Sequence, residues 1–139
     1  MSAPAVAVSL DGKRFAAAWK DVREGAPRVW WVFASEPRFG KDASIADGPR
    51  VDGDHPSLAV TGRGAFWAAW EEGRGATARI RVRCSAGGES SREVAGADRG
   101  PTSFPVVTCG GGLTVLAWEE TPAAGPSRVS FRVLEDARH

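Results

Sequence analysis

The chain of 139 residues repeats one order of landmarks three times. Each repeat opens with a proline and a short apolar run, and passes through a glycine-containing turn to an Ala-Trp pair. Charged residues follow, and then an Arg-Val or Arg-Ile pair. The three tryptophans are Trp19, Trp70 and Trp118, and the landmarks recur every 48 to 52 residues. Self-similarity at this period indicates propeller blades or solenoid units, in which each repeat packs on its neighbours.

Each repeat predicts short β-strands. The second apolar run of the first repeat, 15–19, is apolar at every position, and a helix is the competing interpretation because it is rich in alanine. Its counterparts at 65–70 and 113–118 argue against a helix, since they contain aromatic and β-branched residues and are bounded by glycine. A strand that is apolar on both sides is typical of sheets stacked face to face.

The third strand of each repeat alternates with a period of two. One face is apolar in all three repeats, and the other carries arginine or serine in the second and third repeats. The apolar positions are Val29, Trp31 and Phe33, then Ile80, Val82 and Cys84, then Val129, Phe131 and Val133. The first repeat has Trp30 and Val32 on the other face. We therefore expect this face to be covered, and Trp30 and Val32 are candidate interface residues.

A weaker fourth strand, ending near Ile45 or Val94, completes the first two repeats, and the third repeat stops after its third strand. We expect an all-β chain of three propeller-type blades with about four, four and three antiparallel strands, half of a six-bladed β-propeller. A single segment, 1–139, would contain blades at about 4–48, 55–100 and 104–139.

Three blades would leave two apolar flanks uncovered, because propellers close with about four to eight blades. Either a second copy closes the ring as a two-fold homodimer, or the chain is a piece of a longer one.

Charge and composition exclude several classes of function. The net charge of +1 gives no electrostatic reason to bind nucleic acid or an anionic membrane, and no apolar run approaches the length of a membrane span. The first residues lack the features of a signal peptide, and the sequence indicates no compartment. Asp47, Asp52 and Asp54 do not fit a calcium loop, so a solvated turn is expected there.

Two cysteines and two histidines do not form a zinc-ligand spacing, so no metal or cofactor is predicted. Cys84 and Cys109 are expected to be thiols on different strands. Small apolar strand residues of this kind are usually packed rather than reactive.

Polar residues at equivalent positions suggest a ligand site. In a propeller, the loops after the second strands and the loops between blades lie at one end; here they are expected at 20–27, 71–77, 119–126, 46–55 and 95–103. They carry or adjoin acids and arginines at equivalent positions, namely Asp21, Glu72 and Glu120 with Arg28, Arg79 and Arg128. Convergent groups of this kind would bind a glycan or a polar peptide. The alternative is a structural ion pair that recurs because the blade recurs.

The repeats resemble blades of sialidase-like β-propellers, the Asp-box or BNR repeat family. The resemblance rests on the Trp-acid end of the second strand and on the Ser-x-Gly-Gly turn at 85–88. The family turn is Ser-x-Asp-x-Gly-x-Thr-Trp, and 85–91 lacks its Asp and final Trp, so the repeats are degenerate.

Catalytic members of that family use a tyrosine nucleophile, and this chain contains no tyrosine. The resemblance therefore implies a non-catalytic, lectin-like binding or scaffold module that self-associates. The alternative is a fragment of a sialidase-like glycoside hydrolase whose catalytic residues lie in missing blades.

Overall fold

A computed structural model of the chain describes residues 2–35, 38–46, 52–86, 90–96 and 100–134. These residues form antiparallel β-sheets and one short 3-10 helix, Gly75–Thr77, so the predicted all-β class is confirmed. No helix in these ranges is long and apolar enough to cross a membrane.

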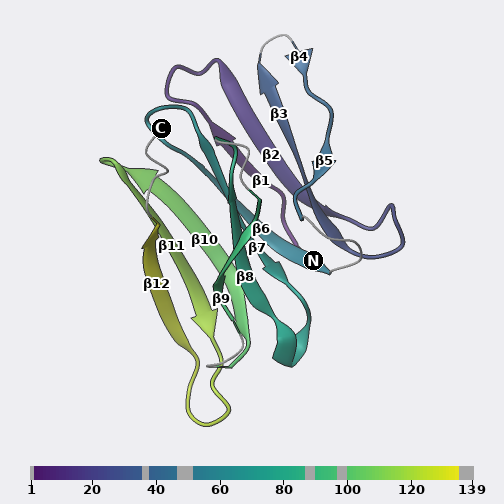
Figure 1. Ribbon diagram of the computed structural model, residues 1–139, viewed down its shortest axis with the longest axis vertical. Coiled ribbons are helices and arrows are strands. Elements are labelled where there is room, and N and C mark those ends of the chain that lie inside the picture. The colour runs from purple at the N-terminus through teal and green to yellow at the C-terminus, as the bar shows by residue number, and fades with distance from the viewer. Residues whose placement is uncertain (1, 36–37, 47–51, 87–89, 97–99, 135–139) are drawn as a thin grey trace.

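Three sheets follow one another along the chain (Figure 1). The first sheet contains β1 (Ala5–Val8), β2 (Arg14–Asp21), β3 (Arg28–Ser35), β4 (Arg38–Phe39) and β5 (Ala43–Ser44). The second contains β6 (Gly53–Val60), β7 (Phe66–Glu72), β8 (Arg79–Cys84) and β9 (Arg92–Ala95). The third contains β10 (Thr102–Gly110), β11 (Leu113–Glu120) and β12 (Arg128–Leu134).

Each sheet is a meander in which successive strands pair, except that β5 pairs with β3 and not with β4. In the first sheet β4 and β5 both pair with β3, so they act together as one split fourth strand. With that split, the expected four, four and three strands are confirmed.

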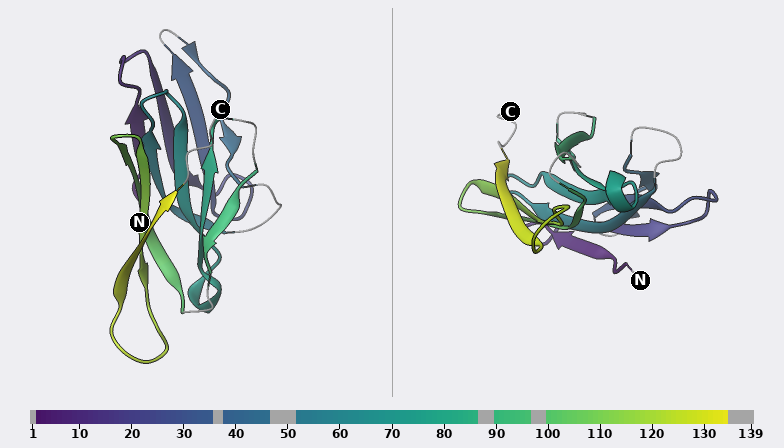
Figure 2. Two further views of the ribbon diagram at one scale, coloured as in Figure 1. Left: turned by 60° about the vertical axis from the view of Figure 1, so that its left-hand side comes forward. Right: turned by 90° about the horizontal axis from the view of Figure 1, so that it is seen from below.

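The sheets pack face to face in chain order (Figure 2). Strand β6 lies against β1 and β2 on one side and against β10 on the other. The Ser57 hydroxyl accepts a hydrogen bond from the Val107 amide at 3.0 Å, which ties β6 to β10. We call the side of each sheet that looks toward the next sheet its forward face, and the opposite side its backward face.

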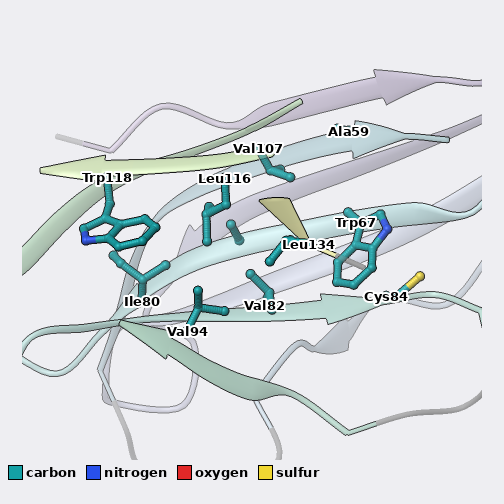
Figure 3. Close-up of a cluster of buried hydrophobic side chains, with 11 residues drawn as sticks. Ala59, Trp67, Ile80, Val82, Cys84, Val94, Val107, Leu116, Trp118 and Leu134 are labelled. Atoms are coloured by element: carbon teal, nitrogen blue, oxygen red, sulfur yellow. The ribbon is translucent and has the colours of Figure 1, made fainter. Parts of the chain in front are cut away.

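Strand β7 is covered on both faces. Phe66, Ala68 and Trp70 belong to the buried cluster shared with the first sheet, whereas Trp67 and Ala69 belong to the cluster shared with the third. Figure 3 shows the second cluster, in which side chains of β7 and β8 meet those of β10 and β11. The apolar residues on both faces of β7 follow from this stacking, as expected from the sequence.

The predicted loops between repeats were too long. Strands β6 and β10 begin at Gly53 and Thr102, so the expectation of loop as far as His55 and Ser103 is wrong. Both strands run through a register shift that includes the proline of the repeat. The residue before each proline, His55 or Phe104, has a φ of 48° or 52°. Proline cannot donate to the ladder and restricts the residue before it, so the strand bulges there and continues. Within the predicted loops between blades, residues 47–51 and 97–99 lie outside the described residues.

Candidate functional site

Strand register places each repeated acid opposite the repeated arginine of its own sheet. The pairs are Asp21 with Arg28, Glu72 with Arg79, and Glu120 with Arg128. Each acid also accepts a hydrogen bond from the indole of the tryptophan two residues before it, at 3.5, 3.3 and 3.0 Å in chain order. The repeated Trp-x-acid pattern is therefore a local hydrogen-bonded unit at the end of the second strand.

At Glu120, whose exposed fraction is 5%, both the tryptophan and the arginine of the repeat bind the acid. Trp118 donates to Oε1, and Arg128 Nε donates to Oε2 at 2.9 Å. Burial raises the pKa of Glu120, but the bonds from Arg128 and Trp118 outweigh it and hold the pKa below its ordinary value of 4.5. Glu120 is therefore a paired carboxylate.

Glu72 is equally buried and has more cationic neighbours. Arg79 Nη2 donates to Oε1 at 3.0 Å, and Arg81 Nε lies 3.7 Å from Oε2. Both arginines come from β8, the strand paired with β7. The acid thus links the second strand to the third.

The first repeat departs from this pattern. Asp21 is bound by Arg23, whose Nε donates to Oδ2 at 2.7 Å, while Arg28 instead lies 3.4 Å from Glu24. The hydrogen bond from Arg23 lowers the pKa of Asp21, although burial opposes it. Arg23 also bonds to Asp42 at 2.7 Å. Aspartate is one methylene shorter than glutamate, and Asp21 binds Arg23, two residues along the chain, instead of Arg28 on the paired strand.

The six predicted ligand-binding residues therefore form separate sets within their own sheets. Across the described ranges, no hydrogen bond or ion pair joins one set to another. This geometry supports the structural interpretation of the repeated pairs. Ligand binding by Asp21, Glu72, Glu120, Arg28, Arg79 and Arg128 stays a prediction.

A second polar cluster was missed in the sequence. His55 Nδ1 lies 3.1 Å from Glu71 Oε2, and the imidazole meets Phe104 edge to face at 4.6 Å between ring centroids. Lys20 Nζ lies 2.5 Å from Asp54 Oδ2; burial raises the Asp54 pKa, but the bonds it accepts, with that from Lys20 foremost, hold it below its ordinary value. One feature of the sequence could have indicated this cluster. His55 and Phe104 precede equivalent prolines, so the two residues meet when β6 packs against β10.

The forward face of the third sheet is an open apolar flank. Val129, Phe131 and Val133 are exposed by 76%, 74% and 51%. The equivalent residues of β8, Ile80 and Val82, are fully buried against the third sheet. We call Val106, Val129, Phe131 and Val133 the third-sheet flank.

The backward face of the first sheet is only partly covered. Register places Val6, Val8, Trp19, Trp30 and Val32 on it, and we call these residues the first-sheet flank. Val6 and Val8 are exposed by 63% and 53%. The Arg23 guanidinium lies 4.4 Å from the Trp30 ring and covers part of it. The indole Nε1 of Trp30 is buried without a hydrogen-bond partner.

Cys84 and Cys109 are both thiols, as predicted. No group of three or more metal-ligating side chains occurs in the part of the chain that the structure describes.

No protein-family model matches the chain, and a search of curated proteins finds no match.

Proposed function

We propose that the chain is half of a six-bladed β-propeller, and that two copies close the ring to form a non-catalytic binding or scaffold module. One observation carries the proposal. A single repeat position is fully buried in β8 at Val82 but 74% exposed in β12 at Phe131. Large exposed apolar patches mark interaction surfaces, and here the repeat itself indicates what would cover the patch.

The packing within the chain supports this choice of partner surface. The forward face of the first sheet covers the backward face of the second, and the forward face of the second covers the backward face of the third. The third-sheet flank is a forward face without a cover, and the first-sheet flank is a backward face without one. The two flanks are therefore complementary, and a second copy of the chain carries both.

The residue types on the first-sheet flank support this pairing. The backward faces of β8 and β12 carry arginine or serine, and Arg83 is accommodated there by stacking 5.3 Å from Trp31 and donating to the Ile45 carbonyl. At the equivalent positions β3 carries Trp30 and Val32. An apolar backward face suits the apolar third-sheet flank, because desolvation of an unpaired arginine is avoided.

Two copies suffice for closure. Six blades fall within the range of about four to eight in which propellers close, and the same contact would occur twice about a two-fold axis. His55 and Phe104, at the bulges of β6 and β10, would then lie on the innermost strands, where ligands of propellers commonly bind. A glycan or polar peptide remains the class of ligand that the resemblance to sialidase-like propellers implies.

Variants on the two flanks test the proposal. Phe131→Glu and Trp30→Glu should each convert a dimer to a folded monomer, because each would bury an unpaired charge in the interface. Val22→Glu, at an apolar residue that is 62% exposed in the loop between β2 and β3, is the matched control and should stay dimeric. Light scattering after size exclusion gives the mass, and circular dichroism confirms the fold. Dimers that withstand both flank variants would refute the proposed interface.

A further inference from the structure

We infer that the chain binds a small amphipathic anion, an apolar body with one carboxylate, in a cavity between the second and third sheets. This site goes beyond the proposed assembly. It lies at the end where the hairpins β6–β7 and β10–β11 turn, opposite the end at which the sequence predicted a ligand. All the residues that line the cavity belong to one copy of the chain.

The cavity has the size and lining of a small-molecule site. Its volume is about 580 Å³, within the range of about 300–1,000 Å³ that is usual for such sites. Trp67 and Cys84, exposed by 4% and 6%, contribute side chains from the buried cluster, where Figure 3 shows them next to each other. Leu10 and Leu113 lie at its edge with exposed fractions of 84% and 56%.

Glycine-rich backbone forms another part of the wall. The turn between β10 and β11 consists of Gly110, Gly111 and Gly112, and φ is 56° at Gly111 and 79° at Gly112. A Cβ atom built on any of these glycines would meet no atom within 4 Å. The space beside the turn is therefore open, and a ligand would approach the backbone closely.

Arg63 supplies the charge that selects the ligand. It is the one charged residue among the described residues that line the cavity. It is exposed and pairs with none of the described residues, whereas Arg14 holds the same β6–β7 turn by donating to the Gly64 carbonyl at 3.0 Å. An apolar cavity with an unpaired guanidinium at its edge fits a ligand with an apolar body and a carboxylate.

The first experiment is calorimetric titration of 1-naphthoate into the purified chain, with the neutral 1-naphthalenemethanol as the matched ligand. Naphthoate should bind more tightly, and Arg63→Gln should weaken naphthoate by about fivefold while leaving the neutral ligand unchanged. Arg74→Gln is the control variant, because Arg74 is an exposed arginine in the loop at the other end of β7. Equal binding of the two ligands, an unchanged affinity in Arg63→Gln, or no binding at millimolar concentration would each overturn the inference.

The thiol of Cys109 offers an independent test of where the ligand binds. Cys109 lines the cavity and is only partly buried, so N-ethylmaleimide should modify it and bound naphthoate should slow that reaction. Modification at an unchanged rate with saturating naphthoate would place the ligand elsewhere. Both readouts apply to monomer and dimer, so their failure is distinguishable from failure of the assembly.

Discussion

The layer between the second and third sheets and the third-sheet flank are built from the same repeat positions, yet they differ completely in exposure. Ile80 and Val82 are fully buried in the layer, while Val129 and Phe131 are exposed by 76% and 74% on the flank. Alternation of apolar residues therefore indicates a face that requires a cover. It does not specify whether the cover comes from the same chain.

The largest expected effect comes from placing an aspartate at Val82 or, in a separate variant, at the equivalent residue Phe131. Val82→Asp should abolish folding, because an unpaired carboxylate in the layer costs several kcal/mol out of a typical total of about 5–15 kcal/mol. Phe131→Asp should keep the native circular dichroism and lose only the dimer. If Phe131→Asp also unfolds the chain at low concentration, the flank stabilises the protomer itself and the distinction between the two regions fails.

A second, intermediate effect concerns the buried acids. Glu120→Ala should lower the free energy of unfolding by about 1–3 kcal/mol, since Trp118 Nε1 and Arg128 lose their acceptor. Glu24→Ala is the control, because Glu24 is half exposed and its contact with Arg28 is a surface pair worth less than about 1 kcal/mol. Urea unfolding measures both. Equal losses would show that burial of the Trp-acid-Arg unit adds nothing to its stability.

The sequence predicted the regular parts of this fold and missed the irregular ones. Period-two alternation and the repeated Ala-Trp landmark gave the strand number, because both depend on local side-chain direction. The bulges at His55 and Phe104 were missed, since a proline in a strand normally suggests a strand end. Only packing of β6 against β10 makes continuation through the bulge favourable.

The candidate sites show the same limit. The sequence identified the repeated acids and arginines and left a ligand site and a structural ion pair within each repeat as alternatives, but it could not show which cation each acid binds. It also could not show that Trp67, Cys84, Arg63 and Cys109 line one cavity, because these residues come from three strands and a hairpin turn. Such a site depends on tertiary packing rather than on spacing.

The smallest effect is a pH dependence that separates the paired acid from an ordinary one. The folded-state pKa of Glu120 lies below 4.5, so its contribution to stability is fully present above that pH and is lost as the pH falls through the lowered value. The difference in unfolding free energy between the native chain and Glu120→Gln should therefore shrink from pH 6 toward pH 3. Urea titrations across this range measure it. A difference that stays constant or grows on acidification would show that the carboxylate is not stabilised by Arg128 and Trp118.

Sedimentation equilibrium of the unmodified chain tests the closure of the ring most directly. Two copies of the 14.7 kDa chain should sediment as one dimer at micromolar concentration, with no larger species, because closure leaves neither flank free. A well-folded monomer at that concentration would contradict the account.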